Sequence, residues 1–207
     1  EELGDVMFAL VNFARFQGFD ADDLLNQCTM KFAARFRMVE AALAHIEAFL
    51  IPEMNTAMDS CADLVQFYWC GDDFSTQRGL MMSPQTWRRF FKPLYRRMFQ
   101  AIKGHGLSVW FHSCGTFRPV LPDLIDIGMD IWETVQVHLP GNDPADLKRE
   151  YGRYISFYGG ISTQWTLPRG TPDEVRAEVR ERIRVLGKGG GYFCSSDHAI
   201  MPDVAFQ

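Results

Sequence analysis

The chain has 207 residues, of which 47% are hydrophobic and 14% aromatic, and its formal net charge is −5. This size allows one large domain or two small ones, and the negative charge argues against nonspecific binding to nucleic acid or to an anionic membrane. We find no apolar run long enough to span a bilayer and no signal peptide, and the five scattered cysteines favour a reducing, cytoplasmic location over a disulfide framework.

The first forty or so residues predict an α-helical hairpin. Residues 1–17 form one amphipathic segment, and Gly18 is typical of the position after a helix end. A second helix is predicted over residues 22–42, with Asp20 or Asp22 as its cap. The apolar positions that recur at helical spacing are Val6, Leu10, Phe13 and Ala14 in the first helix and Leu24, Leu25, Phe32, Phe36 and Val39 in the second.

Two acidic residues, Glu2 and Asp5, lie three positions apart on the first helix, so their carboxylates share one face. They could belong to a Mg²⁺ site, or they could be a solvated acidic first turn favoured by the helix dipole. Residues 1–42 resemble the C-terminal end of a MazG-type nucleoside triphosphate pyrophosphohydrolase domain, which binds Mg²⁺ through an EExxE motif and an ExxD motif. Glu2 and Asp5 match ExxD, and Lys31 and Arg35 match basic residues near the triphosphate. Since EExxE is absent, the resemblance implies half of a magnesium site and no pyrophosphohydrolase activity.

Residues 43–61 change in character and form the expected junction between two segments. The second helix is expected to reach Leu50 and to break at Ile51 and Pro52, because proline removes a helical hydrogen bond and clashes with the preceding turn. The chain opens on Glu-Glu within a helical pattern and closes with no helix after its last expected strand. We therefore expect both ends to be cut.

Residues 62–207 alternate between strands and helices, which predicts a parallel sheet built from βαβ units. Such a sheet forms either a (β/α)8 barrel or an open doubly wound fold. No GxGxxG motif or P-loop follows a strand, so a dinucleotide site or a P-loop is only weakly supported. The expected strands are Asp63–Cys70, Leu107–His112, Met129–Gln136, Ile155–Gly159 and Tyr192–Cys194, and the expected helices begin at Ser83, Arg118, Pro144 and Thr171.

A candidate metal site lies at the ends of two of these strands. His112 and Cys114 are two residues apart, so in extended backbone their side chains point to the same side. Cys194 ends the last strand. Together they predict a three-ligand zinc site with an open position, which is typical of catalytic zinc. The alternative is an ordinary buried strand end.

Further polar residues follow the strands at the same edge, where parallel α/β folds place their active sites. Asp73 and Gln136 could line a pocket, although Asp73 could also cap its loop. Asp197 and His198 directly follow the last strand and could orient a metal ligand or contact the substrate. We therefore take Asp73, Gln136, Asp197 and His198 as candidate catalytic residues.

Residues 50–207 resemble the uroporphyrinogen decarboxylase superfamily, through GDDFSTQRGLMMSP, WFHSCGTFRPVLPDLIDIGMDIWETVQ, DPADLKREYG, SFYGGISTQWTLPRGTPDEVRAEV and GGGYFCSSDHAIMPDV. The resemblance implies an α/β chain that forms part of a (β/α)8 TIM-type barrel, about its last five strands. His112, Cys114 and Cys194 match the His-x-Cys and later Cys of the zinc-dependent corrinoid methyltransferase branch.

That branch moves a methyl group from methylcobalamin, as a free corrinoid or on a corrinoid protein, to a small thiol or similar acceptor. We expect this activity here, with zinc as cofactor, no nucleic-acid or membrane partner, and a possible homo-oligomer. Three alternatives stay open. The chain could be a uroporphyrinogen decarboxylase of porphyrin biosynthesis, a nucleoside triphosphate pyrophosphohydrolase through its first segment, or a fragment that holds zinc without turnover.

Overall fold

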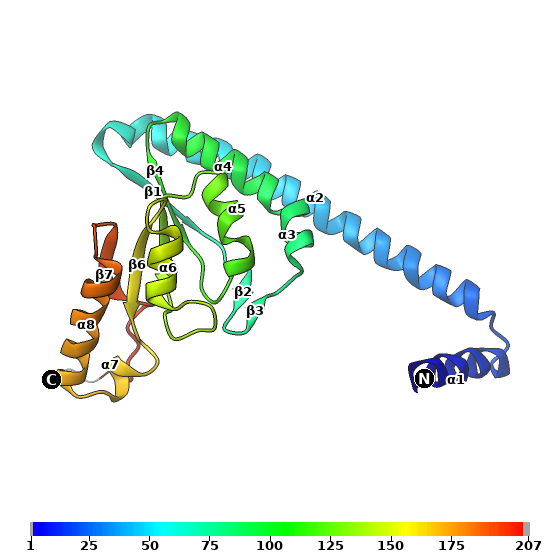
Figure 1. The fold of residues 1–207 in the computed structure, drawn as a ribbon. Helices are drawn as coiled ribbons and strands as arrows, with labels where there is room; N and C mark the ends of the chain where they lie inside the picture. Colours follow the sequence, from blue (N-terminus) through cyan, green and yellow to red (C-terminus); the bar gives the residue numbers. More distant parts are fainter. Residues whose placement is uncertain (1, 205–207) are drawn as a thin grey trace. The chain divides into compact units, whose positions relative to one another are not determined.

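The computed structural model describes residues 2–204, and the chain divides into two compact units, one up to Leu50 and one from Ile51 onward (Figure 1). The first unit contains α1, Glu2–Phe16, and the beginning of α2, which spans Ala21–Cys61. The Asp20 carboxylate accepts hydrogen bonds from the backbone N–H groups of Asp22 and Asp23 at 2.8 and 3.0 Å, which confirms Asp20 as the cap of α2.

The predicted helix break at Pro52 is wrong, since α2 continues through this residue to Cys61. A proline inside a helix costs about 3 kcal/mol. Met54 and Met58 lie one turn apart just after Pro52, and both are buried in the core of the second unit. We attribute the continuous helix to this packing, because burying two large apolar side chains offsets a cost of that size.

The second unit is organised around a sheet of five parallel strands in the order β1-β4-β5-β6-β7 (Figure 1). This confirms the predicted α/β class with a parallel sheet. A short antiparallel pair, which the sequence analysis did not predict, follows β1. The strands are β1 Phe67–Gly71, β2 Ser75–Thr76, β3 Gly79–Leu80, β4 Ser108–His112, β5 Ile131–Val135, β6 Ser156–Ile161 and β7 Tyr192–Ser196.

The helices of this unit begin where their capping residues predict. The Ser83 side chain accepts a hydrogen bond from the Thr86 backbone, and Thr171 and Glu174 form a reciprocal capping box. The four-residue helix α7 was not expected. The short helices are η1 Ala62–Leu64, η2 Arg118–Val120 and α7 Thr166–Arg169, and the longer ones are α3 Pro84–Phe90, α4 Lys92–Gly104, α5 Leu121–Asp126, α6 Pro144–Tyr151 and α8 Pro172–Leu186.

The two faces of the sheet differ because successive side chains along a strand point to opposite sides. On β4, Val109 and Phe111 are buried in the core, where the Phe111 ring contacts Tyr95 and Phe99 of α4. Trp110 and His112 point to the opposite face. That second face is partly open, and it carries the residues described next.

Among residues 2–204, none of the helices combines the length and the apolar character that crossing a membrane requires.

Candidate functional site

His112 is the last residue of β4, and its imidazole lies between two potential partners. Its Nδ1 is 3.5 Å from Oε1 of Glu133 on β5, and its Nε2 is 3.5 Å from Sγ of Cys114. The side chain is 20% exposed. One ring nitrogen therefore faces a carboxylate, and the other faces the loop that carries the thiol.

His198 completes a group of three metal-ligand side chains with His112 and Cys114. One donor atom from each of the three lies within 4.8 Å of the other two. His198 belongs to the loop after β7, and its ring centroid is 6.2 Å from that of His112. The structure therefore brings together the expected pair, His112 and Cys114, with a residue that the sequence analysis placed beside the metal ligands.

Cys194, the third expected ligand, is not part of this group in the described chain. It lies inside β7 between Phe193, whose ring is 5.5 Å from that of Trp110, and Ser195, which donates a hydrogen bond to the Tyr158 hydroxyl at 2.9 Å. Those two neighbours face the side of His112. Cys194 faces the opposite side because of the two-residue period of a strand, so the expected ligand set His112, Cys114 and Cys194 is not assembled.

The loop that carries Cys114 is held through the backbone of this residue. The Cys114 N–H donates a hydrogen bond to Oδ1 of Asp73 at 2.7 Å, and the Cys114 carbonyl accepts one from the Ser75 hydroxyl at 2.5 Å. Asp73 Oδ1 also lies 3.9 Å from His112 Nε2, so this candidate residue reaches the group of three donors. The carboxylate therefore sets the position of the thiol and adds negative charge beside it.

Burial raises the pKa of the Cys114 thiol, the Thr134 hydroxyl lowers it, and the carboxylates of Asp73 and Asp197 raise it. The net effect is a pKa above the ordinary value. The proton therefore stays on sulfur at neutral pH, and a cation bound beside the sulfur would be needed to displace it.

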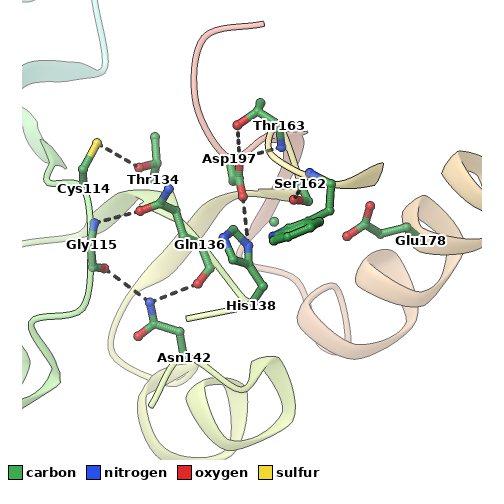
Figure 2. A network of polar contacts seen from close by, with 12 residues as sticks. Cys114, Gly115, Thr134, Gln136, His138, Asn142, Ser162, Thr163, Glu178 and Asp197 are labelled. Atoms are coloured by element: carbon green, nitrogen blue, oxygen red, sulfur yellow. Dashed lines mark hydrogen bonds and ion pairs between the residues drawn. The ribbon is translucent and has the colours of Figure 1, made fainter. Parts of the chain in front are cut away.

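Gln136 supports the same loop from the neighbouring strand end (Figure 2). It is buried, and its side-chain oxygen accepts a hydrogen bond from the Gly115 N–H at 2.8 Å. The Asn142 amide in turn donates to the Gln136 carbonyl at 3.1 Å. Gln136 is thus placed beneath the turn that presents Cys114.

Two residues of the site, Glu133 and Trp69, were missed by the sequence analysis. Glu133 lies within β5, and its Oε2 accepts a hydrogen bond from the Trp69 indole N–H at 2.7 Å. A carboxylate inside an otherwise apolar strand is unusual unless it is paired, and this was the available signal. Trp69 gave no such signal, because an aromatic residue is ordinary in a strand.

Two cavities flank the group of three donors. The larger, about 530 Å³, is lined by Cys114, Gln136 and His198 with other polar residues, including Ser75, Thr163 and Arg169. The smaller, about 320 Å³, lies against His112, Glu133 and Trp69 on the open face of the sheet, and His198 borders both. A small polar molecule in the larger cavity would lie beside the thiol and the His198 imidazole.

The donor set fits zinc. Imidazole nitrogen and thiolate sulfur are zinc's preferred ligands, and a set of three leaves a position for a substrate. The Glu133 carboxylate lies 3.5 Å from the far nitrogen of His112 without a hydrogen bond to it, and a closer approach would give the carboxylate contact that orients a metal-binding histidine. The side chains of Glu2, Asp5, Lys31 and Arg35, in contrast, are exposed in the first unit, and neither acidic residue belongs to a cluster of three potential ligands among those described.

Comparisons with known proteins point to one family with two kinds of enzyme. The chain is 29% identical over 115 residues to the methylcobamide:CoM methyltransferase MtaA of Methanosarcina barkeri, covering 54% of this chain and 32% of the relative. It is 26% identical over 184 residues to a uroporphyrinogen decarboxylase of Thermus thermophilus, covering 82% of this chain and 49% of the relative. Among solved structures, a methyltransferase from Methanosarcina mazei matches with a TM-score of 0.55 and 21% identity, covering 69% of this chain and 39% of that one, which is a likeness of fold.

The chain spans half or less of the length of these relatives. The sequence profile of uroporphyrinogen decarboxylase (URO-D) matches residues 25–207, so it also includes part of α2 that the sequence analysis assigned to a MazG-like segment. A match over this much of the chain shows that the protein belongs to the uroporphyrinogen decarboxylase (URO-D) family.

Proposed function

We propose that this chain belongs to a zinc-dependent methyltransferase that moves a methyl group from a corrinoid to a thiol or similar acceptor. The observation that carries the proposal is the convergence of His112, Cys114 and His198 within 4.8 Å at the carboxyl edge of the sheet. A thiol and two imidazoles are preferred ligands of zinc. Their convergence therefore favours a zinc-dependent reaction over a reaction that needs no metal.

The similarity to the Methanosarcina barkeri methyltransferase supports this choice within the family. That protein's name specifies a methylcobamide donor and the acceptor CoM. By analogy, the partners here would be a corrinoid, free or on a corrinoid protein, and a small thiol. The larger cavity, about 530 Å³ and beside Cys114 and His198, has room for such an acceptor.

A zinc ion on these residues would supply the positive charge that keeps an acceptor thiol deprotonated at neutral pH. The chain's own residues prepare the site. The Glu133 carboxylate lies beside His112, Asp73 holds the Cys114 backbone, and the Gln136 side chain supports the Gly115 turn. Two of these contacts hold the backbone of the loop that carries Cys114, so this part of the site is ordered before a substrate arrives.

We also propose that the sheet is part of a (β/α)8 barrel. All five strands are parallel, helices pack against one face, and aromatic side chains such as Trp69, which is 56% exposed, lie on the other. In a barrel that second face would line the interior. The likeness to the Methanosarcina mazei structure supports this arrangement.

The first test is zinc content per chain, by elemental analysis after dialysis against a mild chelator. We expect about one zinc in the unmodified protein, and a loss in His112→Ala, Cys114→Ser and His198→Ala. The matched control is Cys194→Ser, which should keep its zinc. Loss of methylcobalamin absorbance with a thiol acceptor then tests turnover. A folded chain that binds no zinc would refute the proposal.

Uroporphyrinogen decarboxylase is the second candidate, because the Thermus thermophilus enzyme matches 82% of the chain, against 54% for the methyltransferase. A decarboxylase activity that survives chelation would favour it. Tight zinc binding without methyl transfer to any thiol would favour a zinc-holding remnant.

The MazG-like interpretation of residues 1–42 stays a prediction, with Glu2 and Asp5 as half of a magnesium site and Lys31 and Arg35 as nucleotide-binding residues. Pyrophosphate release from nucleoside triphosphates with Mg²⁺ would test it.

A further inference from the structure

Asp197 is a buried carboxylate that the proposed chemistry does not use directly. Its side chain is 0% exposed, and it immediately precedes His198. Burying a carboxylate is costly unless it is paired and hydrogen-bonded. The contacts that offset this cost therefore point to a role for Asp197.

Asp197 is held by residues from two other loops (Figure 2). Its Oδ1 accepts hydrogen bonds from both the backbone N–H and the hydroxyl of Thr163, at 3.0 and 2.7 Å. Its Oδ2 lies 3.5 Å from Nδ1 of His138. Its own backbone N–H donates to the Ile161 carbonyl at 2.8 Å. Both ends of the residue are therefore tied down.

These partners come from successive strand ends. His138 follows β5, Thr163 follows β6, and Asp197 follows β7. Gly159 of β6 lets the backbone of β6 lie close to the backbone of Asp197, since a Cβ added at Gly159 would meet the Asp197 Cα at 3.3 Å. One carboxylate thus links three neighbouring loops at the edge of the sheet where the candidate metal ligands lie.

We propose that Asp197 is a positioning residue, which fixes the turn after β7 so that the His198 imidazole meets His112 and Cys114. The inference rests on the proposed metal centre and adds the element that assembles it. Asp197 does not act as a ligand itself, because its free oxygen faces His138 and it is not part of the three-donor group among the described residues. Without this anchor His198, which is exposed, would have no fixed position relative to the other two donors.

The test is the affinity of the chain for Zn²⁺ alone, measured by competition with a chromophoric chelator. We expect Asp197→Ala to weaken zinc binding by about 10-fold or more, the range seen when residues that orient metal ligands are removed. Thr163→Val, which keeps the side-chain size but removes the hydroxyl, should also weaken zinc binding. Thr163→Ser, which keeps the hydroxyl, should bind zinc as the unmodified chain does. Asp173→Ala is the control, because that aspartate is 93% exposed on α8.

The absorption spectrum of the chain loaded with Co²⁺ gives a second readout, which would not change if Asp197 only stabilised the fold. The thiolate-to-cobalt band from Cys114 should persist in Asp197→Ala, while the visible d–d bands should change as His198 is lost from the coordination sphere. If Asp197→Ala does not fold, the Thr163→Val and Thr163→Ser pair decides.

The outcomes separate the two proposals. If the unmodified chain binds zinc, His198→Ala loses it, and Asp197→Ala binds it as well as the unmodified chain, the positioning role is refuted and the metal centre stands. A lower melting temperature in Asp197→Ala with unchanged zinc affinity has the same meaning. If the folded, unmodified chain binds no zinc, both proposals are refuted.

Discussion

The ends of β4 and β7 look alike in the sequence but differ in the structure. At each end a cysteine stands near a strand terminus, Cys114 after β4 and Cys194 within β7. β4 ends at His112, and Cys114 lies two residues beyond it. β7 ends at Ser196, and the residue two positions beyond it is His198, which is the one that meets His112 and Cys114.

The position of a residue relative to its strand end therefore matters more than its residue type. The first turn of each loop after a parallel strand projects over the edge of the sheet, and there the loops converge. A residue still inside the strand is assigned to one face by the two-residue period. Cys194 is inside β7, so its side chain could not reach the group formed by the loop residues.

The largest effect should come from replacing His198, which follows β7, and the matched replacement is Cys194 within β7. His198→Ala should lower zinc affinity by more than about 100-fold, since losing a ligand should exceed the 10- to 100-fold cost of losing a residue that orients one. Cys194→Ala should leave the affinity unchanged. Competition titration with a chelator measures both. The reverse result would restore the ligand set predicted from the sequence.

The residues that follow the two proposed ligands, Cys114 and His198, should also behave differently. Gly115 has a φ of +90°, and a Cβ there would meet the Thr76 carbonyl oxygen at 2.5 Å. Gly115→Ala should therefore lower the free energy of unfolding by about 2 kcal/mol or more. Ala199, the equivalent residue after His198, has a negative φ, and Ala199→Gly should change stability by less than about 1 kcal/mol. Denaturant unfolding of the two variants compares them, and equal losses would contradict the difference.

A smaller effect should come from Glu133, which lies beside the His112 ring; in the described contacts no carboxylate lies beside the His198 ring in the same way. Glu133→Gln should weaken zinc binding by about 10-fold, because an amide orients the imidazole less strongly than a carboxylate does. Trp69→Phe, which removes the hydrogen bond to Glu133 at 2.7 Å together with part of the ring beside His112, should have a weaker effect in the same direction. Isothermal titration with zinc measures both, and an unchanged affinity in Glu133→Gln would remove Glu133 from the site.

The smallest expected effect lies on the helix side of the sheet, away from both strand ends. Burial acts to raise the pKa of Asp123, but its contacts with Lys92 and Arg88 outweigh this, so the pKa lies below its usual value. A lowered folded-state pKa stabilises the protein above the unfolded-state pKa of about 4, and this is lost as the pH falls through the lower folded-state value. We expect a loss of at most about 1 kcal/mol, absent in Asp123→Asn. Unfolding curves between pH 5 and about pH 3 test this, and identical curves for the two proteins would contradict it.

Much of the fold could be predicted from local signals. The starts of α3 and α8 follow from Ser83 and Thr171, because a capping side chain followed by proline is a local pattern that tertiary packing seldom overrides. The path of α2 through Pro52 could not be predicted, since it depends on where Met54 and Met58 are buried. The sequence carries the local cost of the proline but not the packing that offsets it.

The site was predicted in part, for a related reason. His112 and Cys114 share one strand end, so their proximity follows from a two-residue spacing. The third donor depends on the last residue of β7, and the expected strand ended at Cys194, two residues earlier than the observed strand. Because of that difference, the expected ligand was Cys194, whereas the donor that lies near His112 and Cys114 in the structure is His198.

The loops after β4 and β7 are held to different degrees, and this has a consequence for motion. The backbone N–H groups of Cys114 and Gly115 donate hydrogen bonds to the side chains of Asp73 and Gln136, whereas His198 is exposed. Hydrogen-bonded amide protons exchange slowly with solvent, so those of Cys114 and Gly115 should exchange more slowly than that of His198. The half of the site that carries His198 would then open and close while the half that carries His112 stays formed. A bound cation would slow exchange chiefly at His198, and hydrogen–deuterium exchange with and without Zn²⁺ would show it.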